Sequence, residues 1–459
     1  MLISVKQLFE SPSEFIGKEV KVEGWVRSNR GQKEFGFINL NDGSYLDNIQ
    51  VVYESTLENF SEISKYRVGC ALRATGVVVE SQGKAAVEIK ANSVFLEGDC
   101  PEDYPIQPKR HTREFLREQA YLRPRTNLFS AVFRMRSILA FAIHKFFQER
   151  NFIYVNSPLI TSNDGEGAGE MFQVTTLDLN RIAKEGKVDY SKDFFGKPVN
   201  LTVTGQLEAE TYAQAFKKVY TFGPTFRAEN SNTTRHASEF WMIEPEIAFA
   251  ELSDDIKLIE EMVKYVIKYA LDNASSEIKF FDQLVAPGKK QQLEELIASE
   301  MKVCTHKEAI KILLDSKVDF ETKPEYGQDL ATEHEKYLTD VHFKAPVFVT
   351  NWPKEIKAFY MRLNDDNETV AAVDLLVPGA GELVGGSQRE ERLDVLLSRM
   401  QELNMKTEDF DWYINLRKYG GTKHSGFGMG FERLIMYVTG VENIRDVIPY
   451  PRTPRNCEF

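Results

Sequence analysis

The chain has 459 residues, of which 42% are hydrophobic, and a formal net charge of −12. This length suggests two or more domains with large cores, and the negative charge argues against a protein that coats nucleic acid without sequence preference. No apolar run is long enough to span a bilayer, and no signal peptide is visible, so we expect a cytoplasmic protein with no membrane partner. The four cysteines are widely scattered, which favours reduced thiols over disulfides or a zinc site.

Residues 18–97 read as a series of short β-strands. In KEVKVEGWVR, Val20, Val22 and Val26 follow the alternation of a half-buried strand. The runs FGFINL, NIQVVY, CALRATGVVVE and AAVEIKANSVFLE follow, and turns such as Asn41-Asp42-Gly43 separate several of them. Five such strands fit a small closed barrel of the oligonucleotide-binding (OB) type, and an SH3-like barrel fits the count as well.

A proline-rich segment, CPEDYPIQPKR, follows these strands and is typical of a linker. We therefore place a first domain at residues 1–100 and a hinge at residues 101–126. From Pro108 to Asn127 the chain carries only two acidic residues, against six basic ones: Lys109, Arg110, Arg113, Arg117, Arg123 and Arg125. Taken alone, this track is explained by a solvated helix face.

From residue 127 to residue 459 the pattern is mixed. LFSAVFRMRSILAFAIHKFFQER has apolar residues at helical spacing. The strand-like runs FIYVNSPLI, KVYTFGPTF and AVDLLV alternate with the helical runs DIKLIEEMVKYVIKYAL and THKEAIKILLDS. We therefore predict an α+β fold whose second domain contains a sizeable sheet.

The densest group of polar residues lies in FGPTFRAENSNTTRHASEFWMIEPEIAF, which predicts two strands joined by a loop. The charged residues on or at the mouth of this hairpin are Arg227, Glu229, Arg235, His236 and Glu239. Two arginines and a histidine facing one space suit a polyphosphate, because guanidinium groups stay charged and bond phosphate oxygens in pairs. Phe240 starts the return strand, where its ring is placed to stack on a base. A surface hairpin with ion pairs is the alternative interpretation.

A glycine-rich run, HSGFGMGFERL, comes near the C-terminus. Gly426, Gly428 and Gly430 allow the backbone to approach a ligand closely, and a helix from about Phe431 places Arg433 in its first turn. The run is neither a P-loop nor a dinucleotide fingerprint. Alone, it is explained equally well as a structural strand-to-helix turn.

Two carboxylates lie in the run AAVDLLVPGAGELVGGSQREERLDVL. Asp374 belongs to an apolar strand, and Glu382 follows a tight glycine-rich turn. Brought together across a hairpin, they are placed to hold Mg²⁺ against phosphate. Arg389 ends the return strand and points at the same space if the two strands pair.

Together these segments resemble the signature motifs of class II aminoacyl-tRNA synthetases. The hairpin F-R-A-E…R-H…E-F is similar to motif 2, and GFGMGFERL is similar to motif 3. NFIYVNSPLI is similar to motif 1, with Pro158 at its proline and Asn151 where glycine is usual; Asn tolerates a left-handed backbone. With the N-terminal barrel, the whole chain resembles the aspartate, asparagine and lysine subgroup. This implies a homodimer whose catalytic domain, residues 127–459, has an antiparallel sheet flanked by helices.

The resemblance implies a role for each matching residue. Arg227 corresponds to the arginine that binds the α-phosphate and the amino-acid carboxylate, and Arg433 to the arginine on the other side of ATP. The implied ATP site also contains Glu229, Arg235, His236, Phe240, Glu382 and Gly430. Glu382 and Asp374 correspond to the carboxylates that hold Mg²⁺. The implied reaction joins an amino acid to AMP, releases pyrophosphate, and then transfers the amino acid to the 3′ end of a tRNA.

One position bears on the choice between an amide and a carboxylate substrate. Aspartate-specific relatives read Q-x-x-K where this chain has Gln206-Leu207-Glu208-Ala209. Without their lysine, a bound aspartate side chain would be buried unpaired, whereas the amide of L-asparagine is not penalised. The runs GEGAGEMF, FRAENSNT, GGSQREERLDVL and IRDVIPYPRTPRN also resemble asparagine-specific members, which implies L-asparagine and tRNA(Asn) as substrates. The implied amino-acid-binding residues are Glu170, Gln206, Ala209, Arg227 and Arg389.

In the barrel, Arg27, Phe37 and Gln50 fall where relatives contact the anticodon. Phe37 is placed to stack on an unpaired base and Gln50 to read a base edge, although the spacing of Phe37 fits a core position equally well. The basic hinge would then follow tRNA phosphates between two binding surfaces.

Three other functions compete with this interpretation. An aspartate-specific enzyme that charges both tRNAs would have a lysine in place of Ala209. A synthetase-like asparagine synthetase would lack the barrel. A noncatalytic RNA-binding relative would have lost Arg227, Glu382 or Arg433, and all three are present.

Overall fold

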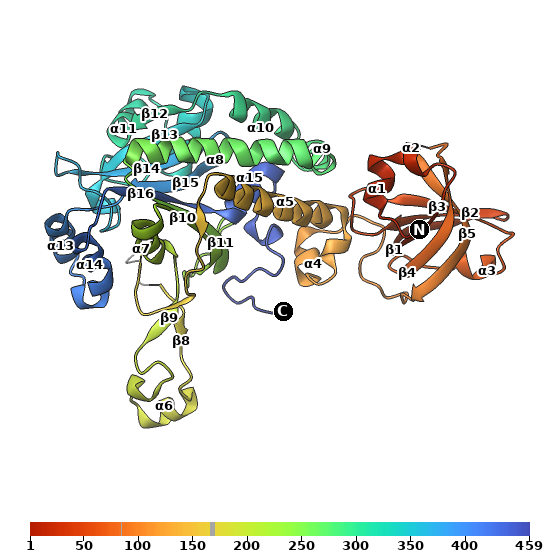
Figure 1. The fold of residues 1–459 in the computed structure, drawn as a ribbon, viewed down its shortest axis with the longest axis horizontal. Coiled ribbons are helices and arrows are strands. Elements are labelled where there is room, and N and C mark those ends of the chain that lie inside the picture. Colours follow the sequence, from red (N-terminus) through yellow and green to blue (C-terminus); the bar gives the residue numbers. More distant parts are fainter. Residues whose placement is uncertain (84, 166–169) are drawn as a thin grey trace. The chain divides into compact units, whose positions relative to one another are not determined.

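The computed structural model describes residues 1–83, 85–165 and 170–459 and divides into two compact units, Met1–Arg134 and Met135–Phe459 (Figure 1). The division falls inside the long helix α5 (Asn127–Glu149), so its first turns belong to the first unit. The composition of the sequence predicts the start of the second domain at residue 127, before this division. In the described part of the chain, no helix is long and apolar enough to cross a membrane. The four cysteines are free thiols.

The first unit contains a closed five-stranded barrel with the strand order β1-β2-β3-β5-β4. Its strands are β1 (Glu19–Gly31), β2 (Phe35–Asn41), β3 (Ile49–Glu54), β4 (Ala71–Glu80) and β5 (Val87–Gly98). The short helix α3 (Phe60–Ile63) joins β3 to β4, and the helices α1 (Val5–Glu10) and α2 (Pro12–Phe15) precede the barrel. Neighbouring strands are antiparallel except β3 and β5, which pair in parallel. The barrel predicted from the sequence is therefore confirmed.

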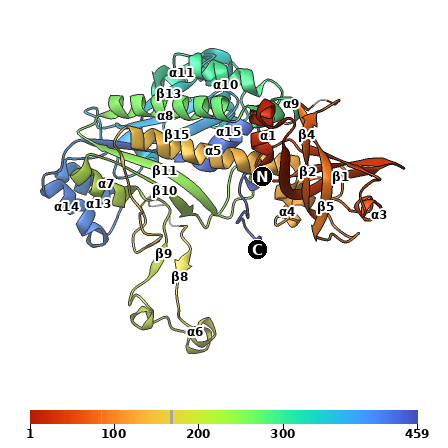
Figure 2. The same cartoon turned by 45° about the vertical axis from the view of Figure 1, so that its right-hand side comes forward.

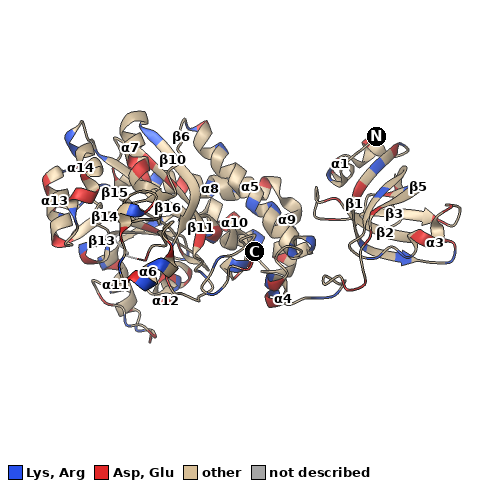
Figure 3. Cartoon of the chain, turned by 90° about the horizontal axis from the view of Figure 1, so that it is seen from below, with Lys and Arg blue, Asp and Glu red and all other residues tan. Residues whose placement is uncertain are grey.

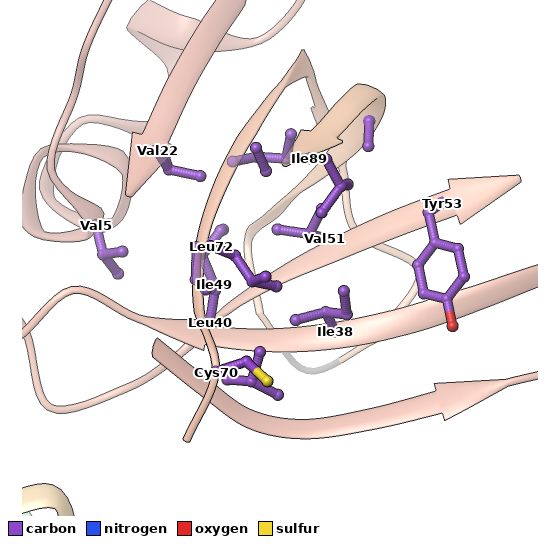
Figure 4. Packing of buried hydrophobic residues seen from close by; sticks show 14 of the residues in the cluster. Val5, Val22, Ile38, Leu40, Ile49, Val51, Tyr53, Cys70, Leu72 and Ile89 are labelled. Carbon is purple, nitrogen blue, oxygen red and sulfur yellow. The ribbon is translucent and has the colours of Figure 1, made fainter. Parts of the chain in front are cut away.

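Alternation along the strands builds the barrel core. In β3 and β4, buried residues occupy every second position, so one row of side chains fills the interior. Ile38, Val51, Leu72 and Ile89 come from four different strands and point toward one another in Figure 4. Val20, Val22 and Val26, which indicated the first strand, are all buried.

The hinge has more structure than its proline content suggested. Residues 101–111 have no helix or strand, but helix α4 (Arg113–Glu118) follows, with Thr112 as its N-cap. Arg123 is fully buried, with its guanidinium 4.4 Å from the centre of the Phe129 ring. It therefore does not belong to an exposed basic track.

The second unit is built on an eight-stranded sheet with the order β12-β13-β14-β15-β16-β11-β10-β6. Neighbouring strands in the series β13-β14-β15-β16-β11-β10 are antiparallel. At the two edges of the sheet, β12 pairs in parallel with β13, and β6 pairs in parallel with β10. The strands are β6 (Ile153–Tyr154), β10 (Lys218–Phe226), β11 (Glu239–Ala248), β12 (Lys302–Thr305), β13 (Val347–Pro353), β14 (Thr369–Val377), β15 (Gly381–Gln388) and β16 (His424–Gly430). The predicted antiparallel sheet is confirmed, with parallel pairs only at its margins.

Helices flank this sheet, as expected. Helix α8 (Leu252–Asn273) crosses β14, β15 and β16, and α15 (Phe431–Thr439) begins directly after β16. The others are α7 (Gln206–Phe216), α9 (Ser275–Leu284), α10 (Lys289–Ala298), α11 (His306–Asp315), α12 (Thr332–Lys336), α13 (Leu393–Glu402) and α14 (Asp411–Lys418). Both signs of charge occur together on helices such as α13 and α14 (Figure 3).

A three-stranded arm leaves the main sheet. It consists of β7 (Ile160–Thr161), β8 (Gln173–Val174) and β9 (Val199–Leu201), in the order β7-β9-β8. Two views show it carrying helix α6 (Leu179–Glu185) away from the eight-stranded sheet (Figures 1 and 2). The arm starts beside the hairpin of β10 and β11, since the N–H of Phe226 donates to the carbonyl oxygen of Thr202 at 2.8 Å.

Candidate active site

A hollow lies over strands β11, β15 and β16, where segments distant in sequence meet. All eight residues that the sequence analysis assigned to ATP line it: Arg227, Glu229, Arg235, His236, Phe240, Glu382, Gly430 and Arg433. Met242, Leu383, Gly428, Glu432 and Ile444 are among the other residues in its wall. The sheet order explains this meeting, because β16 lies between β15 and β11.

The floor of the hollow follows the alternation of strand β11. Phe240 and Met242 are two residues apart and line the hollow, and the same face continues to Glu244 and Glu246. Gly428 on the neighbouring strand leaves room for Met242, because a Cβ there would lie 2.8 Å from its Cε. A larger residue at position 428 would therefore push the end of the Met242 side chain aside.

Three arginines from separate elements surround the hollow. The Arg227 guanidinium lies 5.4 Å from the centre of the Phe240 ring. Arg433 Nη1 lies 3.5 Å from Glu382 Oε1, and Arg235 Nη2 donates to the carbonyl oxygen of Ala380 at 2.7 Å. Arg433 and Arg235 are therefore held at the rim by a loose ion pair and a neutral carbonyl group, which a phosphate can replace.

Glu432 ties the hairpin to helix α15. It is buried, and its Oε2 accepts from the N–H of Trp241 at 2.9 Å, next to Phe240. Its other oxygen, Oε1, lies 2.8 Å from Arg136 Nη2. This contact holds the start of β11 against the helix that carries Arg433.

Two carboxylates approach one point above Gly385. A Cβ on Gly385 would lie 3.3 Å from Asp374 Oδ1 and 3.6 Å from Glu382 Oε1. Asp374 is already paired, because Lys357 Nζ lies 2.8 Å from its Oδ2. Burial raises the pKa of Asp374 to about 6, against the lowering effect of Lys357. Among the described residues no group of three or more potential ligands forms a metal cluster.

Glu335 is a third carboxylate near this point, and no motif of the sequence indicates it. The N–H of Glu382 donates to Glu335 Oε2 at 3.2 Å. Burial, and then the charge of Glu382, raise the pKa of Glu335 to about 7. Gly381 has φ +81°, which favours glycine, and a Cβ there would lie 2.2 Å from Glu335 Oε2 and displace that carboxylate.

Arg389 is buried at the other end of the floor. Its Nε lies 3.2 Å from Glu246 Oε2, its Nη2 contacts Glu246 Oε1, and its Nη1 donates to Ser387 Oγ at 2.7 Å. The guanidinium also lies 5.3 Å from the centre of the Tyr360 ring. Arg389 is thereby fixed in one orientation.

Gln206 begins helix α7 and joins a second buried network. Its Nε2 donates to Glu210 Oε1 at 3.1 Å. Glu210 Oε2 lies 3.1 Å from Arg417 Nη2 and 2.8 Å from His424 Nε2. Burial would raise the pKa of Glu210, but His424 and Arg417 hold it well below its usual value, so the carboxylate is ionised.

The other predicted amino-acid-binding residues differ in their surroundings. Ala209 is fully buried and packs in an apolar cluster with Val155, Ala213 and Val219. Its methyl group does not line the hollow of Arg227. Glu170 is exposed, and its carbonyl oxygen accepts from the N–H of Ala228 at 2.8 Å, which places it beside the hairpin. Residues 166–169 of the run GEGAGEMF lie outside the described residues.

The three predicted anticodon residues line two hollows of the barrel that share Ser28 and Asn39 in their walls. Phe37 and Gln50 line one hollow together with Ser28, Arg30, Asn39 and Glu88, and Gln50 Nε2 donates to Glu88 Oε2 at 2.8 Å. Phe37 is half-buried and lies outside the core. Arg27 instead lines a second hollow with Lys109, Arg110 and Arg125. Arg30 is the basic residue beside Phe37, and it was missed.

Glu246 was also missed, although a signal for it existed. It lies six residues after Phe240, on the same face of a strand whose alternation the sequence already predicted. Lys357 and Glu335 carry no such signal, because each comes from a separate segment outside the matching motifs. Only the tertiary structure brings them to Asp374 and Glu382.

Comparisons with known proteins identify the family of the chain. Residues 112–454 match the family model of tRNA synthetases class II (D, K and N), and residues 20–97 match that of the OB-fold nucleic acid binding domain. The chain is 62% identical to the asparagine–tRNA ligase of Acholeplasma laidlawii, with 100% of each chain covered, and 59% identical to that of Clostridium botulinum, with 99% of each covered. The solved asparaginyl-tRNA synthetase of Pyrococcus horikoshii, complexed with asparaginyl-adenylate, is 30% identical over 99% of each chain, with a TM-score of 0.86. The chain therefore belongs to the class II tRNA synthetases of the D, K and N group, and within it to the asparagine–tRNA ligases.

Proposed function

We propose that the protein activates L-asparagine with ATP and transfers it to the 3′ end of tRNA(Asn). The observation that carries this proposal is the convergence of Arg227, Phe240 and Arg433 on one hollow, in a chain about as long as its asparagine–tRNA ligase relatives. An aspartate-specific enzyme is disfavoured by Ala209, and an asparagine synthetase by the N-terminal barrel.

The hollow performs the first step by positioning and charge. The carboxylate oxygen of asparagine attacks the α-phosphorus, an O–P bond forms, and the bond from that phosphorus to the pyrophosphate oxygen breaks. Arg227 neutralises charge on the α-phosphate and orients the attacking carboxylate. Phe240 stacks on one face of the adenine and Arg433 covers the other. Arg235 and His236 hold the terminal phosphates, and no side chain acts as a covalent nucleophile.

Mg²⁺ fits Glu382 better than Asp374. Magnesium takes oxygen ligands and usually keeps several waters, so one protein carboxylate facing the phosphates is sufficient. Among the described residues, the Glu382 carboxylate is paired only loosely, with Arg433, whereas Asp374 is engaged by Lys357. When bound, Mg²⁺ neutralises phosphate charge. We propose Glu382 as its protein ligand and Asp374 as a residue that orients Lys357.

The amino-acid side chain is placed at the Arg389 end of the floor. The three nitrogens of the Arg389 guanidinium contact Glu246 and Ser387, and one of its remaining N–H groups donates to the amide oxygen of asparagine, while Gln206 and Glu170 lie nearer the α-amino group. Ala209 favours asparagine over aspartate, because an alanine at this position has no cation to pair with an aspartate carboxylate.

The barrel is the proposed anticodon-binding domain. Phe37 offers a half-exposed ring for stacking, and Gln50 and Arg30 offer polar groups to base edges. The hollow formed by Arg27, Lys109, Arg110 and Arg125 follows the phosphates of the same tRNA.

A homodimer and a cytoplasmic location complete the proposal. Phe141 on α5 and Ile153, Leu159 and Ile160 after it are exposed apolar residues in the motif 1 region. A second copy covering them would remove this surface from water. The cytoplasm is where translation consumes charged tRNA.

ATP–pyrophosphate exchange tests the function. We expect exchange that depends on L-asparagine, and charging of tRNA(Asn) by the same preparation. Equal exchange with L-aspartate would overturn the amino-acid specificity, and exchange with neither would overturn the function itself.

A further inference from the structure

A second hollow adjoins the nucleotide hollow in the same unit. The two share Arg235, Glu382, Leu383 and Arg433 in their walls. Beyond these residues the second hollow is lined by helices α10, α12 and α15. It carries four cations, Arg235, Lys289, Lys336 and Arg433, against two carboxylates, Glu382 and Glu442. The excess of positive charge indicates an anionic ligand.

Lys289 gives this hollow a fixed cation. Its Nζ donates to Gln292 Oε1 at 2.6 Å, and Gln292 Nε2 donates to the carbonyl oxygen of Pro378 at 2.8 Å. The amine lies 5.1 Å from the centre of the Tyr437 ring. Burial lowers the pKa of Lys289 to about 8, and no carboxylate among the described residues forms an ion pair with it.

The turn before β15 connects Lys289 with the nucleotide hollow. Gln292 holds this turn at Pro378, and Arg235 holds it at Ala380. Glu382 follows two residues later and faces the proposed magnesium position. Lys289 therefore lies behind the groups proposed to hold the terminal phosphates.

Tyr437 adds a second buried polar group. It is 3% exposed, and its hydroxyl has no hydrogen-bond partner in the part of the chain that the structure describes. A buried hydroxyl without a partner is costly, so a ligand or water beside it is expected. Lys289 and Tyr437 thus border a polar, cationic space that the contacts within the chain leave incompletely satisfied.

We propose that this second hollow binds the pyrophosphate released from ATP, with Lys289 and Lys336 receiving it from Arg235 and Arg433. The inference rests on the proposed function. When the bond between the α-phosphorus and its bridging oxygen breaks, the electron pair stays on that oxygen and the leaving group gains negative charge. This charge arises at the β-phosphate end, but free pyrophosphate is no longer tethered to the α-phosphorus and moves toward the cations beyond the γ-phosphate position, which bound ATP does not approach as closely.

Lys289 has two alternative roles, and each predicts a different effect of its replacement on phosphate ligands. As a structural residue it would stabilise the C-terminal end of α15, next to Gly440, without any effect on phosphate ligands. As a ligand of the terminal phosphates of ATP it would affect ATP and pyrophosphate equally. The experiment separates these uses by measuring both ligands.

The test compares wild type, Lys289→Met and Lys290→Met in asparagine-dependent exchange. Lys290 is the matched control, because it is the next residue, is exposed, and pairs with Glu294 at 3.6 Å outside the hollow. For Lys289→Met we expect the half-saturating pyrophosphate concentration to rise about tenfold, the loss of one charge-assisted contact, while that of ATP stays within about twofold. Lys290→Met should match wild type.

A binding measurement without catalysis accompanies the exchange assay. Inorganic pyrophosphate alone should raise the melting temperature of wild type and of Lys290→Met more than that of Lys289→Met. Unchanged pyrophosphate dependence in Lys289→Met, or an equal rise for ATP, would overturn the proposal. If Lys289→Met does not fold, Lys336→Met replaces it under the same criteria. If the wild-type protein showed no asparagine-dependent exchange, that result would count against the proposed function instead. The melting experiment would still test pyrophosphate binding, because it does not depend on exchange activity.

Discussion

Arg389 meets Glu246 through two points of contact, with Nε 3.2 Å from one carboxylate oxygen and Nη2 against the other. Their side chains are 3% and 0% exposed. Burial would lower the pKa of Arg389, but the charge of Glu246 raises it above its usual value, so the guanidinium is ionised. The pair occupies the end of the floor proposed for the asparagine side chain.

Replacement of Glu246 by Gln should destabilise the protein strongly. The change leaves a buried guanidinium without its counter-charge, which typically costs about 3–5 kcal/mol. Urea unfolding at neutral pH measures the loss. Glu185→Gln, which weakens the exposed pair with Arg181, is the control and should have no measurable effect. Equal midpoints for the two variants would contradict the ionic role of Glu246.

Asp255 should make stability depend on pH. Both of its oxygens are buried on α8 without a hydrogen-bond partner among the described residues, and burial raises its pKa to about 7. Its pKa in the unfolded chain is about 3.9, so the folded state binds the extra proton between these values. Wild-type stability therefore falls as pH rises from about 4 to about 7 and then levels off.

Asp255→Asn removes this dependence. Its free energy of unfolding should exceed that of wild type by a margin that grows with pH, up to about 4 kcal/mol above pH 7. Asp272→Asn, at an exposed pair with Lys268, is the control. Parallel stability curves for wild type and Asp255→Asn would mean that Asp255 is ionised with a partner in solution.

Arg227→Ala should abolish adenylate formation without unfolding the chain. Arg227 is half-buried at the rim of the hollow, so its loss exposes little core. We expect exchange to fall by roughly a hundredfold to a thousandfold with an unchanged melting temperature. Arg181→Ala on the arm should retain full exchange. Substantial exchange by Arg227→Ala would show that the phosphate is bound elsewhere.

The two carboxylates near Gly385 should respond differently to magnesium. Glu382→Ala should raise the Mg²⁺ concentration needed for exchange far more than Asp374→Asn does, because Asp374 is paired with Lys357. Asp374→Asn should mainly lower thermal stability. A magnesium titration of exchange, with melting curves for each variant, checks both statements, and equal magnesium requirements would refute them.

Within the barrel, the hollow of Phe37 should govern tRNA charging alone. Phe37→Ala and Arg30→Ala should raise the tRNA concentration needed for half-maximal aminoacylation, with unchanged asparagine-dependent exchange. Arg27→Ala should have a smaller effect on base recognition, because Arg27 lies in the other hollow. Loss of exchange in Phe37→Ala would indicate damage to the fold instead.

Much of the fold was predictable because its periodicities are strong. The strand KVYTFGPTF is β10 without change of boundary, and α15 begins at Phe431 as predicted. Asn151, placed where motif 1 usually has glycine, has φ 62°, the left-handed conformation that Asn tolerates. NFIYVNSPLI was less regular than its pattern: only Ile153–Tyr154 and Ile160–Thr161 are strands.

The site was predictable only where its residues belong to one local motif. Arg227, Phe240 and Arg433 lie on a hairpin and a strand-to-helix turn whose patterns are legible. Arg123, by contrast, was interpreted as part of a basic surface, because no sequence pattern indicates that its guanidinium is buried against the Phe129 ring. Long-range pairs such as Lys357 with Asp374 depend on sheet order, which short motifs do not encode.

Strand β16, the last in the sequence, lies in the middle of the sheet between β15 and β11. During synthesis, the strands from β12 to β15 and the strands β11, β10 and β6 therefore form two separate groups. Each group keeps an unpaired hydrogen-bonding edge until residues 424–430 leave the ribosome. A nascent chain that stops before this point has neither a continuous sheet nor a nucleotide hollow. Release of the finished chain and the appearance of activity are thus coupled by topology, and truncated products would be inactive and prone to aggregate.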